Sequence, residues 1–204
     1  MNHTESFWSR SVTLYDIFMR SNRKVYAQIC EQIASHLVRD SKVLELACGT
    51  GLLSIPLAAR VRAWEATDLS PEMIRAASRK PHAGSLHFSV QDASCLPYAA
   101  ESFDLVLIAN ALHIIKHPDW VLSEIHRVLK PNGMLFAPTF IHGENTGYRF
   151  RVKLMETVGF RVVNAWSATE FEKFVAGFGF AVEQRNLIGS SIAPLCALAA
   201  HKME

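Results

Sequence analysis

Apolar residues recur along the chain with two spacings, one typical of helices and one typical of strands. A repeat of four residues predicts an amphipathic helix that ends near Asp40, with apolar positions at Val25, Ile29, Ile33 and Leu37. Short apolar or alternating runs predict strands at 42–47, 61–68, 85–90, 103–110 and 134–140, followed by a terminal pair at 180–188 and 194–202. The run at 103–110 is nearly continuous, as in a central parallel strand that is covered on both faces.

Helices are predicted between most of these strands. Ser70 and Pro71 form the N-cap and first position of one helix, and Ser167 with Glu170 has the spacing of a capping box. Further helices are predicted at 15–20, 52–59, 121–129 and 148–158, with the sequence KPNG closing the helix at 121–129. Because strands and helices alternate until the terminal strand pair, the predicted class is α/β, with a parallel sheet and one antiparallel strand.

Composition narrows the class of protein. With 204 residues, of which 50% are hydrophobic, the chain suits one domain with a substantial core. Its net charge of +2 arises from 21 basic and 19 acidic residues spread along the chain, so no nucleic-acid partner is indicated. The four cysteines are far apart and form no CxxC pair, which argues against a disulfide framework and favours a cytoplasmic protein. No signal peptide or membrane span is indicated.

A glycine-containing loop joins the first predicted strand to the next helix, in the sequence VLELACGTGLLSIPLA at 43–58. Gly49 and Gly51 permit positive φ angles and allow main-chain N–H groups to approach a ligand. The third glycine of the dinucleotide pattern GxGxxG is absent, and the carboxylate of Glu45 is unfavourable near a pyrophosphate. We therefore expect a cationic nucleoside without phosphates, with Glu45 accepting hydrogen bonds from it.

Polar residues end the next three strands, at the sheet edge where parallel sheets bind ligands. Asp68 is placed to bind ribose hydroxyls, or else to cap the following helix, although Ser70 already fills that position. Asp92 is placed to accept the amino group of a base, or else forms an Asx-turn. Asn110 is a candidate contact to the ligand, or else a turn residue that ends its strand.

Five motifs occur in order along residues 42–140, and together they resemble the motif series of class I S-adenosylmethionine-dependent methyltransferases. They are LELACGTG, ATDLSPEMI, QDASCLPY, FDLVLIANALHII and EIHRVLKPNGML. The resemblance is greatest to the small-molecule branch that includes quinone-biosynthesis methyltransferases. It implies a Rossmann-like three-layer α/β/α sandwich with a seven-stranded sheet, and S-adenosylmethionine as the cofactor. Ala47 stands where many members have a glycine, which is a small change.

The resemblance also assigns residues to parts of the cofactor. It implies that the loop from Glu45 through Ala47 and Gly49 to Gly51 holds the methionine portion, and that Asp68 binds the ribose. The adenine would contact Leu69, Met73, Asp92 and Ala93, the sulfonium would lie near Asn110, and Tyr15 would cover the cofactor. For Met73 the alternative is ordinary packing in the helix core, and for Tyr15 it is packing of a surface helix.

Methyl transfer depends mainly on alignment of a nucleophile with the methyl–sulfur bond and on the exclusion of water. His113 is the candidate general base, or else borders a pocket without taking part in catalysis. His113 and His117 are four residues apart, but Pro118 and the lack of a third ligand argue against a metal site.

The domain is expected to divide into a helical cap at 1–40, a cofactor-binding core at 41–140, an insertion at 141–165, and a C-terminal helix with a strand pair at 166–204. The acceptor, a small molecule, is expected to bind between residues 7–20 and the insertion, in a monomer or homodimer. Two alternatives are a methyltransferase-like scaffold without activity and a nicotinamide-dependent dehydrogenase.

Overall fold

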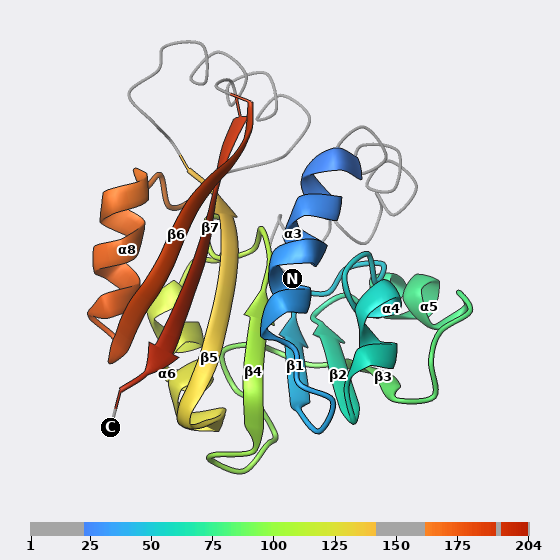
Figure 1. Cartoon of the computed structure of the whole chain (residues 1–204). Coiled ribbons are helices and arrows are strands. Elements are labelled where there is room, and N and C mark those ends of the chain that lie inside the picture. The colour runs from blue at the N-terminus through green and yellow to red at the C-terminus, as the bar shows by residue number, and fades with distance from the viewer. Residues whose placement is uncertain (1–22, 142–161, 191–192, 204) are drawn as a thin grey trace.

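The centre of the molecule is a seven-stranded sheet, in the strand order β3-β2-β1-β4-β5-β7-β6 (Figure 1). The computed structural model describes residues 23–141, 162–190 and 193–203. Its strands are β1 Lys42–Leu46, β2 Ala63–Asp68, β3 Leu86–Val90, β4 Phe103–Ile108, β5 Leu129–Phe140, β6 Phe180–Ser190 and β7 Ala193–Lys202. Strands β1 to β5 pair in parallel, and β7 pairs antiparallel with both β5 and β6. The predicted fold class, with one antiparallel C-terminal strand, is confirmed.

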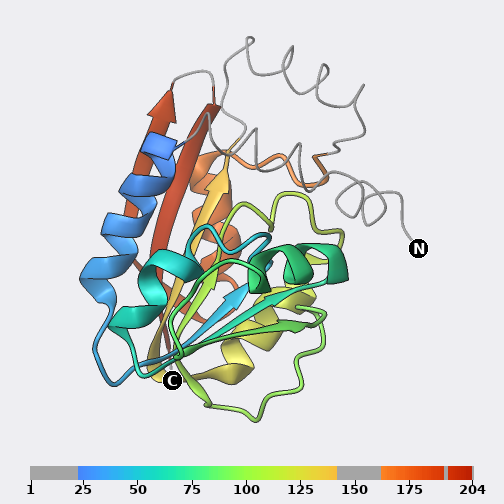
Figure 2. The ribbon, with the colours of Figure 1, turned by 90° about the vertical axis from the view of Figure 1, so that its right-hand side faces the viewer.

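Helices cover both faces of the sheet and make three layers, as the edge-on view in Figure 2 shows. They are α3 Arg23–His36, α4 Ser54–Leu57 with the 3₁₀ turn η1 Ala58–Arg60, α5 Pro71–Ser78, α6 Pro118–Val128 and α8 Ala168–Ala176. One apolar cluster joins α3, α4 and α5 to the sheet, and a second joins α6 and α8 to the opposite face. Ile29 and Ile33 of α3 are fully buried, so the predicted repeat of four does mark the packed face of this helix.

Local signals in the sequence fix where two of the helices begin. Ser70 Oγ accepts a hydrogen bond from the Met73 N–H at the start of α5, and Pro71 occupies the first helical position. Ser167 and Glu170 form a complete capping box at the start of α8, in which each side chain accepts the backbone N–H of the other residue. Both predicted caps are confirmed.

Two predicted elements have different bounds in the structure. The helix predicted at 52–59 is a single turn of α-helix, Ser54–Leu57, followed by η1, because Gly51 at φ +80° still belongs to the loop. The turn predicted at 130–133 lies within β5 as a bulge, since Phe103 pairs with Leu129 and Leu105 with Met134. The helices predicted at 15–20 and 148–158, and Tyr15, lie outside the described residues.

The sheet order determines where a ligand can bind. The chain proceeds from β1 through β2 to β3 on one side and then returns to β4 on the other side of β1. This reversal makes the carboxyl ends of β1 and β4 the switch point of the sheet, where open parallel sheets bind their ligands. Those ends lie at the upper edge of the sheet in Figure 1. In the part of the chain that the structure describes, no helix is long and apolar enough to cross a membrane.

Candidate functional site

The loop after β1 is built from residues with left-handed backbone conformations. Ala47, Gly49 and Gly51 have φ angles of +53°, +56° and +80°. A Cβ atom on Gly51 would lie 2.9 Å from Ile55 Cδ1 and 3.2 Å from Phe88 Cζ, so this position requires glycine for both its conformation and its space. Ala47 adopts the same region with a side chain, at a cost of about 1 kcal/mol. Alanine at position 47, where many methyltransferases of this class have glycine, therefore costs more conformational energy than the sequence suggests.

Asp68, at the end of β2, holds this loop in place. Its Oδ2 accepts a hydrogen bond from the Gly49 N–H at 2.8 Å, and its Oδ1 accepts one from the Ser70 N–H at 2.9 Å. Burial raises the pKa of the carboxyl, and the two N–H groups partly offset that rise. Ser70 caps α5 as expected, but Asp68 has a structural contact of its own, because it joins the ends of β1 and β2.

Glu45 is almost completely buried in β1, with 2% of its surface exposed. Its Oε2 accepts a hydrogen bond from the indole Nε1–H of Trp64 at 3.0 Å. Burial raises the pKa of the carboxyl to about 8, while Ser54 and Trp64 lower it and Asp68 raises it further. The buried Ser54 Oγ has no hydrogen-bond partner among the described residues. From the sequence we expected Glu45 to bind a ligand on the loop. In the structure its hydrogen-bond partner is Trp64, a residue of the core.

Asn110 follows β4 and lies at the switch point. It has a left-handed backbone with φ +53°, and its N–H donates a 2.7 Å hydrogen bond to the Pro138 carbonyl on β5. The side-chain Nδ2 donates to the Tyr26 hydroxyl at 2.9 Å. The Oδ1 atom is buried and has no hydrogen-bond partner among the described residues. A buried polar atom of this kind calls for a partner, so the site suits a cationic or hydrogen-bond-donating ligand.

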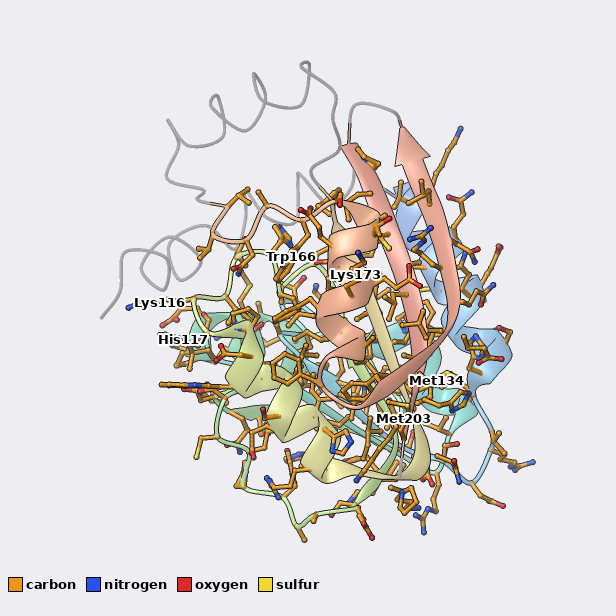
Figure 3. The ribbon with its side chains drawn as sticks, turned by 90° about the vertical axis from the view of Figure 1, so that its left-hand side faces the viewer. Lys116, His117, Met134, Trp166, Lys173 and Met203 are labelled. Atoms are coloured by element: carbon orange, nitrogen blue, oxygen red, sulfur yellow. The ribbon has the colours of Figure 1, made fainter. Side chains whose placement is uncertain are left out.

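His113 lies on the loop after β4 and is 2% exposed. Its Nδ1 lies 3.3 Å from the Thr139 hydroxyl, and its ring packs edge-on against Phe140. His117 does not join it: the His117 ring stacks on Trp120 at 4.5 Å, at the amino end of α6 near the rim of the molecule in Figure 3. Within the described ranges, no group of three histidine, cysteine or acidic side chains could hold a metal ion.

The residues expected near the adenine occupy different environments. Leu69 is 49% exposed directly after β2, and Met73 is 3% exposed on the first turns of α5. Asp92 is exposed and forms an Asx-turn, in which Oδ1 accepts from the Ser94 N–H at 2.8 Å. Ala93 is half-buried against the apolar cluster of α6 and α8. The Asx-turn that was the alternative for Asp92 is therefore formed. An adenine ring would have to bind beside this turn.

Three residues contribute to the site without having been predicted. They are Trp64, which binds Glu45, Tyr26 of α3, which binds Asn110, and Lys80, whose Nζ donates to the Thr50 carbonyl in the glycine loop at 2.8 Å. Each lies 19 to 84 positions from its partner in the sequence. An indole or a hydroxyl in an apolar repeat gives no local signal of such a contact, so only the folded chain shows it.

Comparison with known proteins shows which proteins this chain resembles. Residues 43–133 match a family model described as a methyltransferase domain. The demethylmenaquinone methyltransferase of Lactobacillus johnsonii is 40% identical over 97 residues, which cover 44% of this chain and 40% of that enzyme. The resemblance to class I S-adenosylmethionine-dependent methyltransferases is confirmed. The glycine loop, Asp68 and Asn110 all lie within the matched methyltransferase domain.

Two further relatives define how far the likeness extends. The biotin biosynthesis bifunctional protein BioHC of Saccharophagus degradans is 30% identical over 146 residues, 71% of this chain and 25% of that protein. A solved methyltransferase of Thermotoga maritima, described as S-adenosylmethionine-dependent, has a TM-score of 0.75 at 20% identity, over 97% of this chain and 99% of its own. The methyltransferase fold thus spans nearly the whole chain, whereas the matched segments span less than half of either curated relative.

Proposed function

We propose that this protein is an S-adenosylmethionine-dependent methyltransferase that acts on a small molecule. The observation that carries the proposal is the junction at the switch point, where Asp68 joins the end of β2 to the left-handed glycine loop of β1. The buried, unpartnered Oδ1 of Asn110 beside this junction supports a ligand with cationic or donor groups. The match of residues 43–133 to a methyltransferase domain supports S-adenosylmethionine as that ligand.

Each residue of the junction has a distinct part in this proposal. The glycine loop would hold the methionine portion through its main-chain N–H groups, and Asp68 would exchange part of its contact with the loop for the ribose hydroxyls. Asp92, Ala93, Leu69 and Met73 would border the adenine. When bound, the cofactor supplies an electrophilic methyl group on its sulfonium. The acceptor atom attacks in line with the carbon–sulfur bond, so the chain needs to align it and exclude water.

His113 is the proposed general base. Its burial and its contact with Thr139 hold the ring in one place, on the loop after β4 and three residues beyond Asn110 in the chain. An imidazole in that place would accept the proton of a hydroxyl or thiol acceptor as the methyl group is transferred. A neutral amine acceptor attacks through its lone pair and would need the base less, so the effect of removing His113 reports the class of acceptor.

The acceptor is proposed only as a small molecule. The sequence predicts that the acceptor pocket lies between residues 7–20 and the insertion at 141–165. Almost all of these residues lie outside the part of the chain that the structure describes. Demethylmenaquinone methyltransferases are among the relatives, which supports a quinone precursor as the first acceptor to test. The oligomeric state, monomer or homodimer, and the cytoplasmic location remain predictions.

Thermal unfolding with separate ligands tests the cofactor. At a concentration of 100 times the dissociation constant, a ligand that binds only the folded state adds about 2.7 kcal/mol of stability. We expect S-adenosylhomocysteine to raise the unfolding midpoint and NADH to leave it unchanged; the reverse would support a dehydrogenase. Incubation with methyl-labelled S-adenosylmethionine and a panel of phenols, thiols, amines and quinone precursors then tests transfer. Tight cofactor binding with no transfer to any acceptor would favour a scaffold.

A further inference from the structure

Glu45 and Trp64 form a buried hydrogen-bonded pair on the two strands that precede and follow the glycine loop. Glu45 lies two residues before Ala47, and Trp64 pairs with Val43 on the neighbouring strand. Val43 and Glu45 point to the same face of the sheet, so the indole reaches diagonally across β2 and β1 to the carboxyl. The two side chains are 2% and 0% exposed, and the contact is 3.0 Å long.

No lysine, arginine or histidine is among the described groups that most affect the pKa of this carboxyl. The groups with an electrostatic or hydrogen-bonding effect on it are Ser54 of α4, Trp64, and Asp68 at the end of β2. Two thiols also interact with it, Cys30 of α3 and Cys48 of the loop. Burial of an ionised carboxyl without a cation is unfavourable, so Glu45 should be protonated in the free protein and should ionise only when a cation binds beside it.

We propose that Trp64 is a positioning residue for the cofactor site, because its indole N–H fixes the orientation of the Glu45 carboxyl beneath the glycine loop. This inference rests on the proposed function, in which the glycine loop holds the methionine portion, and it adds that the ammonium group of that portion binds beside Glu45. With one oxygen bound to the indole, the carboxyl is held in a single place and supplies negative charge to the cation, in addition to that of Asp68 at the loop. Trp64 acts through Glu45 and does not itself contact the ligand.

Cofactor binding should depend on pH if Glu45 ionises when the cation binds. Burial raises the pKa of Glu45 to about 8, so the carboxyl is largely protonated at pH 7 in the free protein. A bound cation favours the ionised form, and binding therefore releases a proton and becomes stronger as pH rises toward 8. The thiols of Cys30 and Cys48 have pKa values raised to about 11 and well above 9, which leaves them neutral in this range.

The test is the affinity of S-adenosylhomocysteine, measured by titration calorimetry from pH 6 to pH 9, for the wild type and for Trp64→Phe. Phenylalanine keeps most of the buried ring but removes the N–H donor, which lowers the pKa of Glu45 in the wild type. We expect the midpoint of the pH dependence to rise by about one pH unit in Trp64→Phe, with affinity at pH 7 reduced about tenfold and nearly restored at pH 9.

Glu45→Gln is the matched control, because it removes the ionisation and leaves the titration of the ligand. In that background, Trp64→Phe should leave the midpoint unchanged. An equal loss of affinity at every pH, or the same loss with and without Glu45, would overturn the positioning role while leaving the cofactor intact. Failure of the wild type to bind at any pH would overturn the proposed function and this inference with it.

A second measurement needs no substitution at Trp64. The indole N–H resonance of Trp64 in a nitrogen-15 spectrum, assigned as the one that Glu45→Gln displaces, should shift with a midpoint near pH 8 in the free protein. Addition of S-adenosylhomocysteine should lower that midpoint. An indole resonance that is insensitive to both pH and ligand would contradict the proposal even if Trp64→Phe failed to fold.

Discussion

Replacement of Glu45 by glutamine should make the stability of the free protein much less dependent on pH. The carboxyl has a pKa of about 8 in the folded state, raised chiefly by burial from an ordinary value of 4.5. The folded state therefore holds the proton more tightly than the unfolded state, and the free energy of unfolding falls as pH rises from 4.5 to about 8. Above pH 8 this loss is complete, and below pH 4.5 it is absent.

The magnitude follows from the interval between these two pKa values. At about 1.4 kcal/mol per pH unit, the interval sets an upper limit of about 5 kcal/mol for the loss of stability at pH 8. Entry of water around an ionised carboxyl reduces this figure, so we expect a loss of about 2 kcal/mol or more in the wild type. Since whole domains are stable by about 5–15 kcal/mol, this is a large effect for one residue.

Urea unfolding followed by circular dichroism at pH 5, 6.5 and 8 measures this effect. The wild type should lose stability relative to Glu45→Gln by about 2–3.5 kcal/mol between pH 5 and pH 8. Glu31→Gln, which changes an exposed glutamate on α3, serves as the control and should follow the wild type. Parallel pH dependence of the wild type and Glu45→Gln would refute the reasoning, because it would mean that Glu45 ionises as easily in the folded protein as in the unfolded chain.

Other predictions concern the loop and the proposed base. Asp68→Ala removes the two hydrogen bonds to the backbone and the carboxylate proposed to bind the ribose, so it should weaken S-adenosylhomocysteine binding by at least tenfold in calorimetry. Unchanged affinity would show that Asp68 does not bind the ribose. Gly51→Ala should destabilise the protein by about 1–3 kcal/mol in thermal unfolding, because its Cβ would press on Ile55 at φ +80°, whereas Gly84→Ala, with open space around it, should be neutral within about 0.5 kcal/mol. His113→Gln should lower kcat for a hydroxyl or thiol acceptor about 100-fold without changing cofactor affinity; an unchanged kcat with such an acceptor would show that it only borders the pocket.

Much of the fold follows from local patterns in the sequence. The repeat from Val25 to Leu37, the nearly continuous apolar run at 103–110 and the caps at Ser70 and Ser167 each depend on neighbours within a few positions, so the sequence alone predicts them. The same holds for the glycine loop, since Gly51 is required by its own φ angle and by Ile55 four residues later. The order of five motifs was enough to predict the family.

The tertiary structure decided what each site residue contacts. From the sequence we expected Glu45 to bind the ligand on the loop and Asp68 to bind the ribose; the structure shows that Glu45 accepts a hydrogen bond from Trp64 and Asp68 accepts one from the glycine loop. His113 and His117 are four residues apart in the chain, but their surroundings differ, because one ring is buried and the other stacks on Trp120. Cross-strand contacts join residues that are far apart in the chain. Burial keeps a carboxyl away from water and so raises its pKa. A sequence pattern records only which residue types stand near one another along the chain, and so it predicts a ligand site at these strand ends but not how the charged side chains there are held.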